Sequence, residues 1–413
     1  MSPTRELPPT AGMPVSPFEL VNLITARDTF AEDICKFLAV DDVEFFSSAT
    51  TALWIAFETL KRKTGRTHIV LPGYTCPLVA ISAHAAGLRV RLCDLQPNSF
   101  ELDLNHLERI ADEKVACIVP TDMAGLPCYI EGVSAIARRN GAYVIEDAAQ
   151  AFGASRKNTP LGTAADITVF SFAAGKGLSL VDGGIASVPD PDLRSLLRKT
   201  ANELLRPDFG LVCLRNLQLL GYSFLYNPTG LKWIYGNDLR KALSTGDLVH
   251  AVGDYFEMQQ PHYKFADWRF KLGAHLMKRL PDFIRSNRNR ALGRIQQISA
   301  QTSLEVMREL SDTEGSWPFL FLLCDGQKTR NKIMSDLWTA GLGVSRLFIH
   351  ELSGYEYLKP ILETESKDLP NARSLAERSF TVSNSHWLDD ETFKHILKAV
   401  QTYAPMDHSA HPA

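Results

Sequence analysis

The sequence lacks the features that mark membrane-spanning, nucleic-acid-binding and repetitive proteins. It contains no run of about 18 apolar residues, the length a helix needs to cross a bilayer. Its net charge of -3 gives no basic excess, and its basic clusters lie among helix-like residues, as on a solvated helix face. No internal repeat or low-complexity tract occurs. With 45% hydrophobic and 22% charged residues, the chain has the balance of a globular protein that binds no nucleic acid.

Cysteine is scarce and without pattern. The seven cysteines include no C-x-x-C pair and no Cys/His spacing typical of a metal site. Their count is odd and several lie in apolar runs, which indicates buried thiols in a reducing compartment. Residues 1–16 are polar and lack the apolar core of a secretory signal. We therefore expect a cytoplasmic protein without a bound metal.

Short apolar runs alternate with helical patterns between Thr67 and Val188. The runs read as strands because they are β-branched or continuously apolar, and Gly87 and Gly141 end two of the helical patterns between them. The predicted strands are Thr67–Pro72, Arg89–Leu95, Lys114–Pro120, Ala142–Glu146, Asp166–Phe172 and Gly184–Val188. This alternation predicts an α/β fold, with a mostly parallel sheet flanked by helices. Ligands bind beyond the carboxyl ends of the strands in such sheets.

The length of 413 residues suggests two or three domains. We expect a large α/β domain over residues 17–189, a helical insertion or connection over 190–261 and a smaller C-terminal α+β domain over 262–405. Residues 1–16 and 406–413 are expected to be flexible tails. In the third part, a long helical pattern covers 268–298, a strand covers 317–324, and helices cover 329–340 and 390–403.

The insertion has a leucine-rich and aromatic middle, residues 209–235, with few charges. Such a segment can act as an interfacial helix that contacts a membrane or a partner enzyme. It can equally pack at a dimer interface or over the site. The sequence leaves these alternatives open.

Two charged residues follow predicted strands. Asp147 ends the buried strand that begins at Ala142, and Lys176 lies in a Gly-rich loop after the strand that contains Ser171. Taken alone, Asp147 can be a helix N-cap, Lys176 an exposed loop lysine and Ser171 a backbone-bonded strand serine. Burial would lower the pKa of a lysine here and free its amine for imine chemistry.

A cluster of hydroxyl side chains opens the helical pattern near residue 50. Ser47, Ser48, Thr50 and Thr51 lie where unpaired helix N–H groups would face an anion, although plain helix capping is the alternative. Pyridoxal phosphate (PLP) needs a lysine for an imine, a carboxylate facing its pyridine nitrogen and a phosphate site at a helix N-terminus. The order of these residues along the chain therefore predicts a PLP site.

Together these stretches resemble the DegT/StrS sugar aminotransferases, a branch of the fold-type-I PLP enzymes. The resemblance covers residues 20–190 well and 262–403 loosely. The matching motifs are Ser48-Ala-Thr-Thr-Ala-Leu53, Pro72-Gly-Tyr-Thr75, Glu146-Asp147-Ala-Ala-Gln150, Phe170-Ser171-Phe172-Ala-Ala-Gly-Lys176 and the pair Gly183-Gly184.

The resemblance implies a fold-type-I transferase with a seven-stranded sheet, and it assigns roles to individual residues. Lys176 would carry PLP as a Schiff base and move the proton, and Asp147 would pair with the pyridine nitrogen. The remaining cofactor contacts would be Gln150 at the ring 3-oxygen, Thr50, Ser171 and the backbone at Ala49 at the phosphate, and Cys76 against the ring. The family is usually a homodimer in which a partner Asn reaches the phosphate, and His262 occupies the matching position.

The implied reaction is a ping-pong transfer of an amino group, with glutamate as donor and a nucleotide-linked keto-sugar as acceptor. It would serve amino-sugar, polysaccharide or glycoconjugate biosynthesis. Three departures concern the substrate: Ala49 replaces the family's phosphate-loop Gly, Cys76 replaces an aromatic residue, and residues 190–261 form a longer insertion. A PLP-dependent sugar dehydratase or eliminase and a non-catalytic PLP-fold binding or regulatory protein remain as alternatives.

Overall fold

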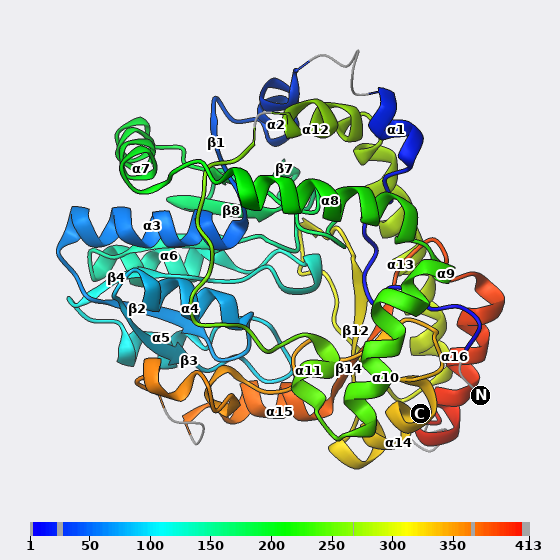
Figure 1. Ribbon diagram of the computed structural model, residues 1–413. Helices are drawn as coiled ribbons and strands as arrows, with labels where there is room; N and C mark the ends of the chain where they lie inside the picture. Colours follow the sequence, from blue (N-terminus) through cyan, green and yellow to red (C-terminus); the bar gives the residue numbers. More distant parts are fainter. Residues whose placement is uncertain (1–2, 23–27, 267, 365–367, 407–413) are drawn as a thin grey trace.

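A seven-stranded sheet forms the centre of the computed structural model, which describes residues 3–22, 28–266, 268–364 and 368–406 (Figure 1). The strand order is β1-β9-β8-β5-β4-β2-β3. Its strands are β1 (Val43–Phe46), β2 (His68–Pro72), β3 (Arg89–Cys93), β4 (Val115–Ile118), β5 (Tyr143–Asp147), β8 (Ile167–Ser171) and β9 (Gly184–Ser187). The five strands from β3 to β8 pair in parallel, and β9 and β1 pair antiparallel. The predicted α/β fold and all six predicted strands are confirmed.

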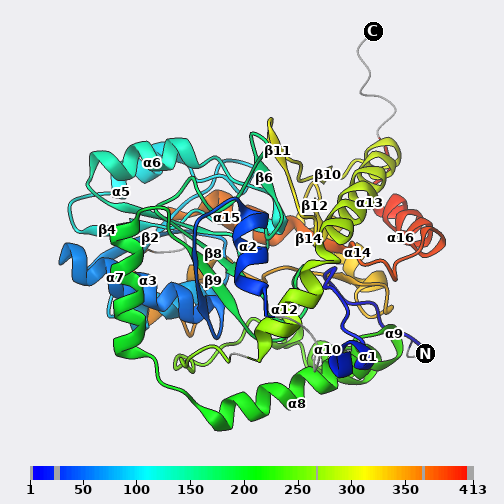
Figure 2. The ribbon, with the colours of Figure 1, turned by 90° about the horizontal axis from the view of Figure 1, so that it is seen from above.

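Helices cover both faces of this sheet, as Figure 2 shows. On one face lie α3 (Ala49–Thr64), α4 (Pro77–Ala85) and α7 (Pro191–Leu204), and on the other α5 (Leu104–Ile110) and α6 (Ile130–Arg139). The inner strands are therefore buried on both faces, which explains their continuous apolar runs.

The seventh strand, β1, is absent from the sequence prediction. Phe45 and Phe46 directly precede the hydroxyl cluster that opens the helical pattern near residue 50, and they pair with β9. A strand of four residues carries too little alternation to be recognised, so its partner decides its conformation.

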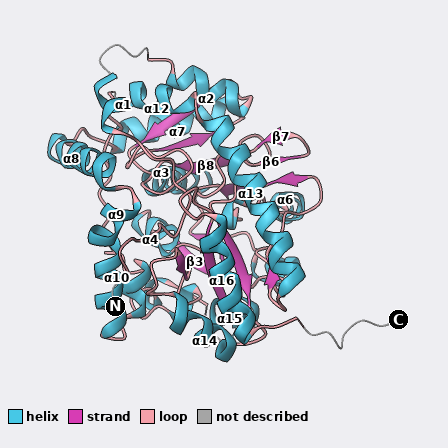
Figure 3. Ribbon diagram, turned by 90° about the vertical axis from the view of Figure 1, so that its right-hand side faces the viewer, coloured by secondary structure: helices cyan, strands magenta, loops and turns pink. Residues whose placement is uncertain are grey.

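A second, four-stranded antiparallel sheet with the order β10-β12-β14-β13 lies in the C-terminal part (Figure 2). Its strands are β10 (Glu305–Val306), β12 (Phe319–Leu323), β13 (Val344–Ser345) and β14 (Ser379–Ser383). The helices of this part, labelled in Figure 3, are α12 (Arg269–Met277), α13 (Leu280–Gln301), α14 (Gln327–Leu337), α15 (Pro370–Arg378) and α16 (Asp390–Tyr403). The predicted helix over 268–298 is two helices, because Pro281 in the first turn of α13 cannot continue a preceding helix. A small third sheet joins β6 (Ser155–Arg156) and β7 (Thr159–Pro160) to β11 (Thr313–Glu314).

The insertion is helical, and part of it faces solvent. After α7 come α8 (Phe209–Leu225), α9 (Pro228–Leu231), the π-helix η2 (Lys232–Gly236), α10 (Asn237–Ser244) and α11 (Leu248–Val252). Along α8, Phe209 is 81% exposed and Leu217 67% exposed. Within the described residues, no helix combines the length and the apolar character that crossing a membrane requires.

The expectation that residues 1–16 form a flexible tail is wrong for residues 3–16. Leu7, Ala11 and Met13 are buried. The backbone N–H of Ala11 donates to the carbonyl of Pro318 at 2.7 Å, and that of Met13 donates to the carbonyl of Lys176 at 3.3 Å. The polar composition of residues 3–16 is typical of a flexible tail, but the few apolar side chains of this segment are buried and hold it against the rest of the protein. Helices α1 (Pro17–Asn22) and α2 (Phe30–Leu38) follow it. In the other predicted tail, residues 407–413 lie outside the described part.

Candidate active site

A cavity of about 330 Å³ opens where the parallel strands end. Strand β5 ends at Asp147 and β8 ends at Ser171, and the segments that follow β2 and β4 also reach the cavity. Seven of the eight predicted site residues line it: Ala49, Thr50, Cys76, Asp147, Gln150, Ser171 and Lys176. The cavity therefore lies at the carboxyl ends of the parallel strands, where the sequence predicts ligand binding.

Lys176 lies in the loop between β8 and β9. Burial of its amine lowers the pKa of Lys176, while the neighbouring Cys76 and Asp147 oppose that shift. A lower pKa leaves more of the amine neutral and nucleophilic. Gly175, at φ 81°, supplies the left-handed backbone of the loop, and the hydroxyl of Thr10 donates to the carbonyl of Gly175 at 2.9 Å.

Asp147 is 4% exposed at the end of β5. Burial raises the pKa of Asp147, and a hydrogen bond from the N–H of Ala149 together with the charge of Lys176 opposes the rise. Gln150 is fixed by its Oε1 atom, which accepts the N–H of Ala124 at 2.9 Å. Its amide nitrogen is a donor suited to an oxygen substituent on a bound ring.

The N-terminus of α3 forms another wall of the cavity. Ser48 is the N-cap, and its hydroxyl accepts the N–H of Thr51 at 3.0 Å. The helix begins at Ala49, so its backbone needs no glycine. The glycine in β9 is needed instead, because a Cβ on Gly184 would lie 2.5 Å from the backbone nitrogen of Ala49. Thr50 lines the cavity at this helix start, where N–H groups favour an anion.

Cys76 follows β2 and is the N-cap of α4. Burial raises the pKa of the Cys76 thiol to about 12, so the thiol stays neutral. Next to it, the hydroxyls of Thr75 and Thr121 lie 3.2 Å apart and both residues line the cavity.

His262 is not among the residues that line the cavity. Its Nδ1 lies 3.2 Å from the hydroxyl of Thr51, and its ring stacks on Trp54 with centroids 4.2 Å apart. Burial lowers the pKa of His262 to about 4, so the ring is neutral. Within one chain, His262 thus reaches the start of α3 through Thr51, and its predicted contact with the phosphate of a partner subunit stays a prediction.

Several lining residues were not predicted. Thr10 comes from the segment expected to be a tail, Asp254 and Phe256 follow α11, and Phe348 follows β13. No motif marks any of them. Their positions depend on contacts between distant parts of the chain, which sequence patterns do not record.

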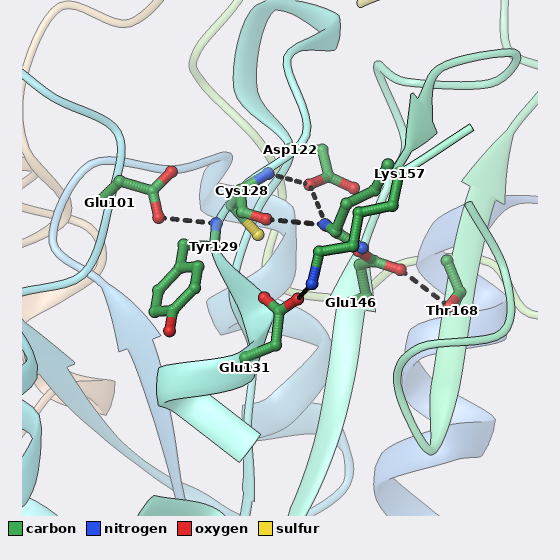
Figure 4. A network of polar contacts seen from close by, with 9 residues as sticks. Glu101, Asp122, Cys128, Tyr129, Glu131, Glu146, Lys157 and Thr168 are labelled. Carbon is green, nitrogen blue, oxygen red and sulfur yellow. Dashed lines mark hydrogen bonds and ion pairs between the residues drawn. The ribbon is translucent and has the colours of Figure 1, made fainter. Parts of the chain in front are cut away.

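A separate buried polar cluster lies beside β5 (Figure 4). Arg156 donates to Glu146 at 2.8 Å and to the carbonyl of Cys128, and Asp122 Oδ1 lies 3.9 Å from Arg156. The ligand atoms of Asp122, Cys128 and Glu146 lie within 4.8 Å of one another, a spacing that could hold a metal ion. The guanidinium of Arg156 is the cation that the two carboxylates share, so this cluster is an ion-pair network that anchors β5.

The fold and the site together define an enzyme that works with PLP. A buried amine of lowered pKa, a buried carboxylate at a strand end, an amide donor and a helix N-terminus with hydroxyls meet in one cavity, and these are the groups that PLP requires.

Comparison with known proteins narrows this class to one family. The family model of the DegT/DnrJ/EryC1/StrS aminotransferases matches residues 22–210 and 250–401. The chain belongs to this family, as its motifs predicted, and it is an aminotransferase. The match leaves out residues 211–249, which include most of α8.

Two curated relatives and one solved structure illustrate the likeness. The spore coat polysaccharide biosynthesis protein SpsC of Bacillus subtilis (strain 168) is 23% identical over 381 residues, covering 90% of this chain and 88% of that protein. The dTDP-4-dehydro-2,3,6-trideoxy-D-glucose 4-aminotransferase of Saccharopolyspora spinosa is 23% identical over 377 residues, again 90% and 88%. The putative sugar aminotransferase Spr1654 of Streptococcus pneumoniae, in its PLP form, shares the fold with a TM-score of 0.73 and 18% identity, covering 96% of this chain and 98% of that one.

Proposed function

We propose that this protein is a PLP-dependent aminotransferase that transfers an amino group from glutamate to a nucleotide-linked keto-sugar. The observation that carries the proposal is the meeting of Lys176, Asp147, Gln150 and Thr50 in one cavity. The name of the Saccharopolyspora relative, a nucleotide-sugar 4-aminotransferase, supports the substrate class. The name of SpsC supports a place in polysaccharide biosynthesis. The seven free cysteines fit a reducing cytoplasm.

Each site residue has a task in this reaction. When bound, PLP supplies an electron sink for the charge that develops at the substrate carbon. Lys176 would hold the cofactor through its amine. Once the amino group of the donor has displaced it, the freed amine, whose pKa burial lowers, would take the proton from the substrate carbon and return it. Asp147 would place a negative charge at the pyridine nitrogen, and Thr50 and Ser171 would bind the phosphate. Apolar side chains such as Phe256 and Phe348 exclude water from the cavity.

Borohydride reduction tests the central assignment. Reduction of the purified wild-type protein should fix the cofactor covalently on the peptide that contains Lys176, and Lys176→Ala should carry no fixed cofactor. Glutamate should convert the wild-type cofactor to its amine form, which a keto-sugar nucleotide should reverse. A wild-type protein that binds no PLP would overturn the proposal.

The alternatives make different predictions in the same assays. A sugar dehydratase or eliminase would release a dehydrated sugar without incorporating nitrogen, so mass analysis of the product distinguishes it. A binding or regulatory protein would retain PLP but leave it unchanged with glutamate. The presence of Lys176 favours transfer of an amino group, since the amine both carries the cofactor and moves the proton.

We further propose that the protein is a homodimer and that the exposed face of α8 is covered by the second copy. Phe209, Cys213 and Leu217 are exposed and follow one another at intervals of four residues, and Leu220 and Phe224 continue the same stripe. Lipid-binding helices carry Lys and Arg beside their apolar face. The one charged residue of α8, Arg215, approaches the buried Asp182 instead. An uncharged stripe fits a protein surface better than a membrane.

Light scattering after size-exclusion chromatography tests this arrangement. Leu217→Glu with Phe224→Glu should convert the dimer to monomers, whereas Asn216→Asp, an exposed polar position on the same helix, should leave the dimer intact. A wild-type monomer that floats with liposomes would instead favour contact with a membrane.

A further inference from the structure

A second buried carboxylate, Asp254, lines the same cavity as Lys176 and belongs to none of the motifs that predicted the site. It follows α11 directly, after Gly253 at φ 78°, and is 3% exposed. The cofactor tasks fall to other residues, so the mechanism gives Asp254 no role.

The structure holds this carboxylate firmly by one side. Its Oδ2 atom accepts the backbone N–H of Ile349 at 2.8 Å and the hydroxyl of Tyr355. Its backbone carbonyl accepts the hydroxyl of Tyr357. Three hydrogen bonds therefore fix the position and the rotation of the side chain.

The other oxygen, Oδ1, accepts no hydrogen bond from the described residues, and it is not one of the polar atoms that protein encloses without a partner. Because Asp254 lines the cavity, we infer that Oδ1 is accessible from it. Arg346 lies near, but its guanidinium donates to the carbonyls of Ile349 and Ala376. A carboxylate taken out of water without an ion pair is costly unless a ligand uses it.

We propose that Asp254 binds a hydroxyl group of the amino acceptor through Oδ1 and thereby selects the sugar. The inference rests on the proposed function and names a specificity residue within it. A sugar offers hydroxyl donors, which an ionised carboxylate accepts. The amino donor glutamate carries two carboxylates of its own, and these are repelled by Asp254. The contact therefore belongs to the acceptor.

The variant Asp254→Asn replaces the hydrogen-bond acceptor Oδ1 by a hydrogen-bond donor. The donors at Ile349 and Tyr355 will retain the carbonyl oxygen of the new amide, so its NH₂ group will face the cavity. An acceptor is thus replaced by a donor of the same shape. Loss of a hydrogen bond to a charged group should raise the KM for the sugar roughly ten- to hundredfold.

The two half-reactions can be followed separately through the absorbance of the cofactor. The conversion by glutamate should be as fast in Asp254→Asn as in the wild type or faster, because the variant removes a like charge. The reaction of the amine form with dTDP-, GDP- and UDP-linked 4-keto-6-deoxyhexoses should lose affinity. Tyr357→Phe is the matched control, because it removes a bond to the backbone of Asp254 and leaves the carboxylate in place. Thermal unfolding and retained cofactor check the folding of each variant, with Asp254→Ala as a second substitution.

Acceptors that lack one hydroxyl each give a readout that a structural role would not move. The wild-type enzyme should lose affinity for one particular deoxy sugar, and Asp254→Asn should not distinguish that sugar from its parent. Equal slowing of both half-reactions, or no change in either, would overturn the inference while leaving the proposed function intact. A wild-type enzyme that accepts none of the sugars would overturn the proposed function itself.

Discussion

Replacing Arg156 by methionine should destabilise the protein strongly, because it leaves a buried carboxylate without its cation. The side chain of Glu146 is 0% exposed and that of Arg156 9% exposed, and their charged atoms lie 2.8 Å apart (Figure 4). After the substitution, Glu146 keeps the hydroxyl of Thr168 at 3.0 Å as a hydrogen-bond donor. The carbonyl of Cys128 also loses two hydrogen bonds.

Removal of one partner from a buried ion pair costs about 3–5 kcal/mol in the free energy of unfolding. Unfolding in urea, followed by far-ultraviolet circular dichroism, measures this loss. The double variant Glu146→Gln with Arg156→Met should recover part of it, because Glu146, the carboxylate nearest to Arg156, then no longer leaves a buried charge without its cation, and only Asp122 does.

The neighbouring residue supplies the control. Lys157 pairs with Glu131 at the same 2.8 Å, but their side chains are 68% and 41% exposed. Lys157→Met should therefore change stability little, since water replaces the lost partner. If Arg156→Met lowered the free energy of unfolding as little as Lys157→Met does, burial would not determine the contribution of the ion pair to stability, and the prediction would be refuted.

Three further predictions concern the site and its surroundings. Burial raises the pKa of Asp254 to about 6, with hydrogen bonds from Tyr355 and Ile349 and the charge of Arg346 opposing the rise. Since protonation removes the acceptor, the KM for the sugar should increase as pH falls through about 6, and Asp254→Asn should flatten this profile. Gly12→Val should release cofactor more readily, measured by dialysis, because a Cβ at Gly12 would lie 2.6 Å from the Cα of Gly175. Iodoacetamide should label the exposed Cys213 fastest in the monomer and more slowly as the dimer forms. Cys76, whose thiol pKa burial raises to about 12, should not be labelled, and mass spectrometry of the peptides measures both outcomes.

The parts of the site that could be predicted from sequence are those encoded locally. Asp147 and Ser171 each end a short, largely apolar strand, and Lys176 follows the second of these strands, so the strand patterns indicated these positions. The parallel arrangement then brought them together, because parallel strands share one carboxyl edge. The N-cap hydroxyls before α3 were visible for the same local reason.

The remainder depends on contacts between distant segments. Asp254 belongs to no predicted strand or motif, and its orientation is fixed by Ile349 and Tyr355, about a hundred residues away in sequence. The sequence also does not predict which of the serines and threonines near residue 50 bond to one another and which line the cavity. The hydroxyls of Ser47 and Ser48 both bond to the hydroxyl of Thr51, and Ser48 and Thr50 line the cavity.

The segment that contains Thr10 and Ala11 stabilises the loop of Lys176, and this affects the order in which the site can form during synthesis. Thr10 is translated 165 positions before its partner Gly175, and Ala11 is translated before its partner Pro318. A growing chain therefore cannot complete the cofactor loop until much of the second sheet has been translated. Cofactor capture should therefore be among the last events in the maturation of the enzyme.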